Sequence, residues 1–184
     1  QLGEEAISTS LMAGAIGLAI VFIFMCIVYL LPGLASSIAL VIYTGIVIVL
    51  LNAFNITLTL PGIAGIVLSI GMAVDANVII FARVKEEMAA GKSVKSSLKS
   101  GFQKAMSAIV DGNMTTLIAA IVLWVKGTGS VKGFAQTLAL GIVVSMFTAL
   151  VVTRIIIYSL YAVGLRSPKL YGSQKPRKER DFLK

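Results

Sequence analysis

The sequence predicts an all-α membrane protein built as a bundle of five transmembrane helices, and three observations lead to this fold class. Hydrophobic residues make up 58% and charged residues 13% of the 184-residue chain, whereas soluble domains are about half apolar and about a quarter charged. The mean hydropathy is +0.96. The apolar runs are about 20 residues long and apolar on all sides, which is typical of membrane helices and not of the alternating strands of a membrane barrel.

The first two predicted spans cover residues 11–31 and 34–51. Only Pro32 and Gly33 separate them, a pair that ends a helix and starts a tight turn. Residues 1–10 are expected to be an extracytoplasmic lead-in from an upstream domain, because the chain starts with a glutamine and shows no signal peptide. We therefore interpret the chain as a fragment of a longer protein.

The remaining spans are predicted at residues 61–82, 109–125 and 133–157, so that the bundle occupies residues 11–165. Pro61 suits the first turn of its helix. Between the third and fourth spans, residues 93–108 carry apolar side chains at spacings of three and four with lysines between them. This pattern predicts an amphipathic helix that lies on the cytoplasmic surface.

Charge asymmetry predicts the orientation in the membrane. The segment after the third span and the tail 166–184 are rich in lysine and arginine, whereas the opposite side carries only Lys126 and Lys132. The positive-inside rule therefore places the C-terminus in the cytoplasm and the N-terminus outside. The tail is polar and is expected to be disordered. The net charge of +8 is interpreted as attraction to anionic lipids at the cytoplasmic face and not as nucleic-acid binding.

One carboxylate lies deep inside the third span. Helix rise places Asp75 about 21 Å from the outer end and about 12 Å from Arg83. An ionised carboxylate at this depth costs roughly 2.5–3.5 kcal/mol, so such residues usually have a function. The chain has no histidine, which leaves Asp75 and Asp111 as candidate proton carriers. The alternative is a structural Asp75 that fixes helix packing, and the one basic partner available for it is Arg154.

Small residues in the third span follow two rows at helical spacing. One row contains Gly65, Ser69, Ala73 and Asn77, and the other contains Ala64, Leu68, Gly71 and Asp75. Because small residues let helix backbones approach closely, the third span is expected to pack on both sides at the centre of the bundle. The residues predicted to mediate helix packing here and in the fifth span are Gly65, Ser69, Gly71, Ala73, Gly141 and Ser145.

The fourth span begins with a second polar group, Asp111-Gly112-Asn113-Met114-Thr115-Thr116. Asp111 is interpreted as a helix N-cap in preference to a proton carrier. The two threonines either hydrogen-bond to their own helix or line a hydrated path beside Asp75, and the sequence leaves both possibilities open. The proton pathway proposed from the sequence consists of Asp75, Asn77, Asp111, Asn113, Thr115 and Thr116.

Other kinds of chemistry have no support in the sequence. Cys26 is the single cysteine and lies within the first span, so the chain offers no disulfide or metal framework. We expect no enzymatic activity, no catalytic residues and no metal. The expected coupling ion is the proton, and no other cofactor is expected.

Three stretches resemble one family. They are the run from Gly71 through Asp75 and Asn77 to Glu87, residues 105–116, and residues 129–135. The chain resembles the SecD/SecF family of protein-export membrane subunits, which is related to the resistance-nodulation-division transporters, over about residues 2–172. The resemblance implies a bundle of that transporter type in the bacterial cytoplasmic membrane, with one further span and a large extracytoplasmic domain upstream. Ala82 departs from the family, because many relatives have glutamate before the arginine.

The resemblance also implies a function. Such a subunit works with SecF beside the SecYEG channel and uses the proton-motive force to help draw unfolded polypeptides across the membrane. Asp75 matches the aspartate implicated in proton conduction, and Asn113, Thr115 and Thr116 match a polar motif on the neighbouring helix. Two alternatives stay open: the membrane portion of a related proton-coupled efflux or lipid exporter, and a purely structural translocon subunit.

Overall fold

The computed structural model describes residues 2–165 and 167–172, and these residues are almost entirely helical. Four helical stretches among them are long and apolar enough to cross a membrane, at residues 7–53, 60–89, 94–126 and 129–162. The predicted all-α membrane fold is therefore confirmed, with four such helices in place of the five expected. The elements are α1 (Leu2–Ala53), α2 (Leu60–Ala89), α3 (Val94–Lys126), α4 (Gly129–Phe147), the π-helical turn η1 (Thr148–Val152), α5 (Thr153–Ala162) and the 3₁₀ turn η2 (Pro168–Tyr171).

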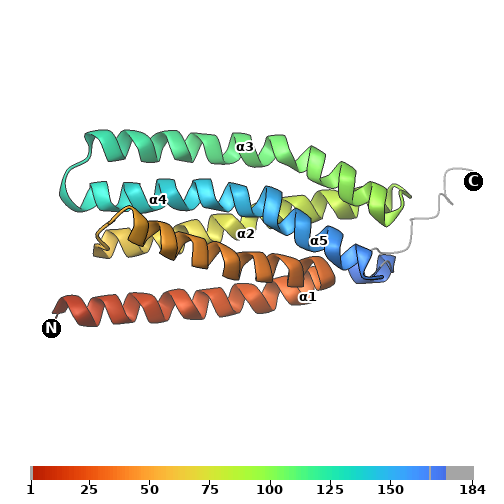
Figure 1. The fold of residues 1–184 in the computed structure, drawn as a ribbon, viewed down its shortest axis with the longest axis horizontal. Coiled ribbons are helices and arrows are strands. Elements are labelled where there is room, and N and C mark those ends of the chain that lie inside the picture. The colour runs from red at the N-terminus through yellow and green to blue at the C-terminus, as the bar shows by residue number, and fades with distance from the viewer. Residues whose placement is uncertain (1, 166, 173–184) are drawn as a thin grey trace, which may run out of the picture.

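Helix α1 contains two helical parts that meet at Leu30, whose backbone angles are φ 51° and ψ −119°. Figure 1 shows that the two parts run back along each other in opposite directions. The reversal lies two residues before the predicted turn at Pro32 and Gly33. A Cβ atom on Gly33 would overlap the carbonyl group of Met25, so the close return of the chain requires a glycine at this position.

Helix α2 begins as the sequence predicts and occupies the centre of the bundle. The Thr59 hydroxyl accepts a hydrogen bond from the Gly62 amide at 3.1 Å, and Pro61 lies in the first turn. The helix packs against α1, α3 and α4. A Cβ atom on Gly101 of α3 would collide with Val84, so α2 and α3 approach closely at that point.

Helix α3 joins two segments that the sequence analysis separated. Residues 93–108 were expected to form a surface helix and residues 109–125 a membrane span, but a single helix runs through both. The apolar positions of the first segment, including Leu98, Phe102 and Ala105, are buried in the main hydrophobic core. The expectation of a separate surface helix is wrong because this apolar stripe packs on the rest of the bundle.

The fifth predicted span corresponds to α4, η1 and α5, which follow one another without a loop. Beyond α5, η2 contacts α1, and the buried Tyr171 hydroxyl donates a hydrogen bond to the Leu165 carbonyl at 2.9 Å. The disorder predicted for residues 166–184 is therefore wrong for residues 167–172. The rest of that tail, residues 166 and 173–184, lies outside the described residues, as does residue 1 of the lead-in.

The chain reversals divide between the two ends of the bundle. Figure 1 shows the start of α1 at the same end as the connections from α1 to α2 and from α3 to α4. The reversal within α1, the connection from α2 to α3 and the end of α5 lie at the other end. This arrangement gathers the basic segment 83–104 and the end of the described chain on one side, as the charge pattern predicts.

Candidate functional site

One face of α2 packs closely against α4. Its small residues Gly65, Ser69, Ala73 and Asn77 are all buried. A Cβ atom on Gly65 would collide with the Thr137 hydroxyl and would lie 3.0 Å from the Phe134 carbonyl oxygen. These contacts support the packing roles predicted for this row, because each position admits the neighbouring backbone.

A buried hydroxyl pair extends this interface to α1. The Tyr43 hydroxyl lies 2.6 Å from Ser69 Oγ, and Ser69 Oγ also donates to the Ile66 carbonyl at 2.8 Å. Gly141 lies directly opposite, where a Cβ atom would collide with Ser69 and approach Tyr43. Ser145, one turn further along α4, is fully buried and donates to the Ile142 carbonyl at 2.8 Å. The predicted packing residues of α4 thus lie in the interface.

Asn77 forms the polar link between α2 and the last span. Its Oδ1 atom accepts a hydrogen bond from Thr153 Oγ1 at 2.9 Å, and its Nδ2 atom donates to the Ala73 carbonyl at 3.3 Å. Both Asn77 and Thr153 are buried. Thr153 follows the π-helical turn η1 directly, so the bond fixes the helix at the point where its regular hydrogen bonding changes. The side chain of Asn77 is therefore engaged in the contact between α2 and α5.

Asp75 lies on the opposite side of α2 and is exposed. It lines a hollow of about 330 Å³ between α2 and the first part of α1, together with Ile20, Val21, Phe24, Gly71, Val74 and Val78. Among the described residues, no side chain forms a hydrogen bond or an ion pair with its carboxylate. Asp75 is thus a free carboxylate on an apolar surface at membrane depth.

Gly71 shares this surface and does not pack as predicted. It is exposed, and an added Cβ atom would have no neighbour within 4 Å. The row that contains Leu68, Gly71 and Asp75 therefore lies on the exposed side of α2, where a hollow separates it from the first part of α1. The sequence pattern indicated a second face correctly, but the first part of α1, which borders this face, does not pack tightly on Gly71.

The polar group of α3 is at the same depth as Asp75 but does not contact it. Gly101 of α3 packs on Val84 of α2, and the two helices run in opposite directions (Figure 1). Asp111 follows Gly101 by ten residues and Asp75 precedes Val84 by nine, so helix rise places both carboxylates at similar depth. Asp111 is exposed in the middle of α3. Its predicted role as an N-cap is wrong, because Ser93 caps this helix.

The other residues of this group differ in their hydrogen bonding and in their exposure. The Asn113 amide donates to the Ile109 carbonyl at 2.8 Å, which is a bond within its own helix. Thr115 is exposed and Thr116 is half-buried, and neither side chain forms a hydrogen bond among the described residues. The structure therefore brings together Asn77 and Thr153, and does not join Asp75 to the predicted residues of α3.

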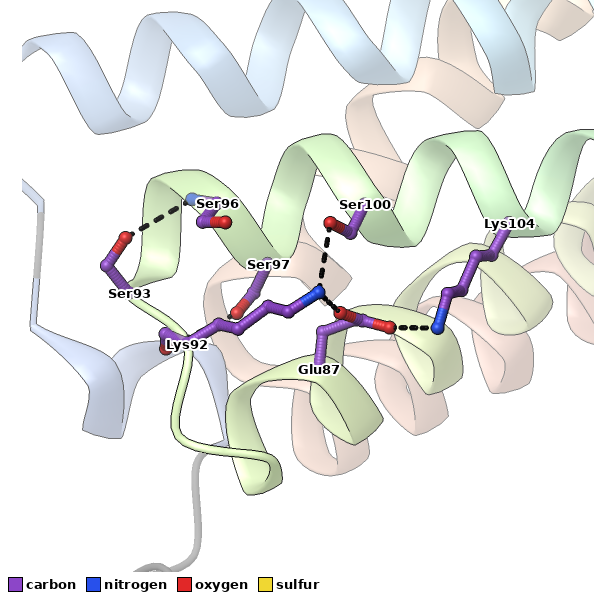
Figure 2. A network of polar contacts seen from close by, with 7 residues as sticks. All are labelled: Glu87, Lys92, Ser93, Ser96, Ser97, Ser100 and Lys104. Atoms are coloured by element: carbon purple, nitrogen blue, oxygen red, sulfur yellow. Dashed lines mark hydrogen bonds and ion pairs between the residues drawn. The ribbon is translucent and has the colours of Figure 1, made fainter.

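A network of charged side chains joins α2, α3 and the connection between them, as Figure 2 shows. The carboxylate of Glu87 is buried and forms ion pairs with Lys104 of α3 and Lys92 of the connection. Lys92 Nζ also lies 3.5 Å from Ser100 Oγ. The hydrogen bonds from Lys104 and Lys92 hold the pKa of Glu87 below its ordinary value of 4.5. The network holds α2 and α3 together beyond the end of the predicted span 61–82.

A second contact at this end holds the reversal of α1 against α2. Lys85 Nζ donates to the Val28 carbonyl at 3.0 Å and lies 4.4 Å from the centre of the Tyr29 ring. The Tyr29 ring in turn lies 5.7 Å from that of Phe81. A cation beside an aromatic ring and a free carbonyl is favourably placed, so Lys85 stabilises the turn at which α1 reverses.

The sequence analysis missed three of these polar residues. Tyr43 is the one tyrosine of the predicted apolar span 34–51, and this could have marked it as a buried donor. Thr153 follows Gly141, Ser145 and Ala149 at a spacing of four in the last span, but nothing in that spacing indicates Asn77 as its partner. Glu87 is one of several charges in a basic segment, and only the tertiary structure shows that it is buried.

The fold and the site together define a multi-pass helical membrane protein with an accessible carboxylate at membrane depth. Residues 1–163 match the family model for protein export membrane protein SecD/SecF, C-terminal. The chain belongs to the SecD/SecF family, in agreement with the resemblance found in the sequence.

Two relatives of similar sequence support this membership. The chain is 51% identical over 174 residues to the protein translocase subunit SecD of Acidaminococcus fermentans, covering 94% of this chain and 42% of that protein. It is 46% identical over 157 residues to the protein translocase subunit SecDF of Bacillus subtilis, covering 85% of this chain and 21% of that protein. The chain thus spans less than half the length of these relatives.

The fold also matches a solved structure. The crystal structure of SecDF from Thermus thermophilus, described as a translocon-associated membrane protein, superposes with a TM-score of 0.85 at 40% identity. The match covers 89% of this chain and 23% of that one. A SecDF structure described as a super-membrane-facing form gives a TM-score of 0.81 at the same identity. The helical bundle is therefore that of the SecDF membrane region.

Proposed function

We propose that this chain is the membrane portion of a Sec translocation subunit that uses the proton-motive force to assist the export of polypeptides across the bacterial cytoplasmic membrane. It acts without enzymatic activity of its own, and Asp75 is the group that binds and releases the proton. The observation that carries the proposal is the position of Asp75, an exposed carboxylate at membrane depth with no partner among the described residues.

The geometry weighs against a structural role for this carboxylate. The one basic partner that the sequence offered, Arg154, lies against the Tyr158 ring at 5.8 Å and lines a hollow with residues of α3. It forms no ion pair with Asp75 among the described residues. A buried structural carboxylate would need such a partner or several hydrogen bonds. A carboxylate open to a hollow is accessible to protons instead.

Energetically, the membrane potential is sufficient for such a step. One elementary charge that crosses 100 mV releases about 2.3 kcal/mol, comparable to the cost of an ionised carboxylate at membrane depth. The proton path is proposed to include Asp75 and the polar group of α3 at the same depth, Asp111, Asn113, Thr115 and Thr116. Asn77 supports this path through packing, because its side chain is engaged by Thr153.

The proposed topology has five crossings, because the two antiparallel parts of α1 each cross the membrane once. The start of α1 then lies outside and the end of α5 lies in the cytoplasm. The basic segment 83–104 supports this orientation. The proposed partners are SecF, the SecYEG channel, translocating polypeptides and anionic lipids. The SecD and SecDF names of the relatives favour this function over an efflux pump or a lipid exporter.

The proposed function is tested by Asp75→Asn in the full-length protein. Asparagine keeps the size and hydrogen bonding of the side chain but cannot titrate. We expect the proton-gradient-dependent part of export into inverted membrane vesicles to fall to the level measured with an uncoupler. Asp75→Glu keeps an ionisable group and should retain part of the activity, and Asp111→Asn should reduce export less. Normal gradient-dependent export by Asp75→Asn would show that this carboxylate is structural.

The orientation is tested by labelling single cysteines with membrane-impermeant reagents. Ser97 is fully buried in the first turn of α3, so the exposed neighbour Ser96 is the better cytoplasmic position. Ser96→Cys should react only from the cytoplasmic side, and Thr128→Cys, which is also exposed, only from outside. The reverse sidedness would overturn the proposed topology.

A further inference from the structure

A second hollow lies between α3 and the last span, away from Asp75. Its volume is about 270 Å³. Two cations, Lys99 and Arg154, lie at its border, and the remaining lining residues are Phe102, Gln103, Met106 and Leu150. Two positive charges and one amide thus border a hollow whose other three lining residues are apolar.

The hollow lies at the depth of lipid head groups. Because Gly101 packs on Val84 and the helices are antiparallel, Lys99 is level with the residues just after Val84. This is the point at which the apolar span 61–82 gives way to the basic segment. Arg154 lines the same hollow, so both cations are at the boundary between the hydrocarbon and the aqueous phase.

Both cations are available to a ligand. The acidic residues of this end are already engaged, since Glu86 pairs with Arg83 at 2.7 Å and Glu87 pairs with Lys92 and Lys104. Lys99 and Arg154 are exposed and form no ion pair among the described residues. Two uncompensated positive charges at the edge of an apolar hollow attract an anion that also carries an apolar part.

The position of Arg154 is set by contacts within the bundle. The preceding residue, Thr153, is held by its hydrogen bond to Asn77. Leu150, which lines the hollow, lies within the π-helical turn η1. Extra residues in a π-helical turn displace the helix surface and often occur at binding sites. The floor of the hollow is formed by Phe102, which is 2% exposed.

We propose that this hollow binds one anionic phospholipid of the cytoplasmic leaflet. Lys99 and Arg154 hold the phosphate, the Gln103 amide donates a hydrogen bond to the head group, and the upper part of an acyl chain packs on Phe102, Met106 and Leu150. The choice of leaflet rests on the proposed orientation, whereas the site itself does not. The proposal narrows the general attraction of a basic face for lipid to a defined site between two helices.

The test measures lipid binding to the purified full-length protein by native mass spectrometry, with phosphatidylglycerol as the probe and phosphatidylcholine as the neutral comparison. Each cation near the surface contributes about a fivefold gain in affinity. We therefore expect Lys99→Gln with Arg154→Gln to weaken the tightest phosphatidylglycerol binding by about thirtyfold. Binding of phosphatidylcholine should be weak in the wild type and unchanged in the variant.

The matched control removes the same charge at the other end of the molecule, with Lys126→Gln and Lys132→Gln, and should change the tightest binding less than about twofold. The charge-conserving pair Lys99→Arg with Arg154→Lys should retain binding, which separates charge from folding. Unchanged phosphatidylglycerol affinity in the double glutamine variant would overturn the proposal. An equal loss in the control, or equal wild-type affinity for phosphatidylcholine, would overturn it as well.

Discussion

The two faces of α2 differ in the way they are covered. The face with Gly65, Ser69 and Asn77 is buried against α1, α4 and α5 and is held by hydrogen bonds. The face with Gly71 and Asp75 is exposed and borders a hollow. Both faces carry a glycine within a row at helical spacing, so the spacing alone does not distinguish a packed surface from an open one.

Substitutions on the two faces of α2 should therefore have different effects on stability. On the buried face, each small residue admits a neighbouring backbone or completes a hydrogen bond, and its replacement disturbs the bundle. On the open face, the small Gly71 leaves space beside a free carboxylate. Removal of side chains from this face costs few contacts among the described residues.

The strongest contrast is expected between two glycines of α2. Gly65→Leu places a side chain against the Thr137 hydroxyl and the Phe134 carbonyl, and overpacking of this kind costs about 3 kcal/mol. Gly71→Leu, which meets no atom within 4 Å at its Cβ position, should change stability by less than about 0.5 kcal/mol. The thermal unfolding midpoints of the two variants in detergent compare them directly. Equal shifts would mean that the open face is packed in the full-length protein.

A smaller effect is expected from the hydrogen bond between Asn77 and Thr153. A double-mutant cycle with Asn77→Ala and Thr153→Val should give a coupling free energy of about 1 kcal/mol, the usual size for a polar contact between membrane helices. Asn113→Ala serves as the control, because its amide bonds to its own helix and should show no coupling to Thr153. A coupling free energy near zero between Asn77 and Thr153 would show that this hydrogen bond does not stabilise the interface.

Glu87, which joins α2 to α3, should make the stability of the protein depend on pH. Its pKa is lowered in the folded protein, first by Lys104 and then by Lys92. The stabilisation is therefore fully present above the ordinary pKa of 4.5 and is lost as the pH falls through the lower folded value. Unfolding midpoints measured between about pH 7 and pH 3 should fall more steeply for the wild type than for Glu87→Gln. Parallel curves would contradict the network in Figure 2.

The smallest effect on stability is expected at Asp75 itself. No described residue pairs with its carboxylate. Asp75→Asn should therefore change the free energy of unfolding by no more than about 0.5 kcal/mol, which the unfolding midpoint measures. The same variant is expected to lose gradient-dependent export. A large loss of stability would show that this carboxylate contributes to packing. It would contradict the expected difference in stability effects between the two faces of α2.

The membrane helices were predictable because their apolar length is a local property of the chain. The start of α2 followed from Pro61, and the reversal within α1 fell within two residues of the predicted turn. The roles of Gly65 and Ser69 followed from their spacing. The role of Gly71 did not, because its row is also at helical spacing although no atom lies within 4 Å of a Cβ position at Gly71. Asp111 was misassigned because the sequence does not show that α3 continues unbroken from Ser93.

By itself, the sequence determined that this is a helical membrane protein of the SecD/SecF family and that Asp75 is its most informative carboxylate. These conclusions depend on composition, on the length of apolar runs and on a local motif, which a linear chain displays fully. The tertiary structure decided which row of α2 is covered, that Thr153 engages Asn77, and that Lys99 and Arg154 share a hollow. Such pairings join residues far apart in the chain, and they depend on the rotation and depth at which helices pack, which no local pattern specifies.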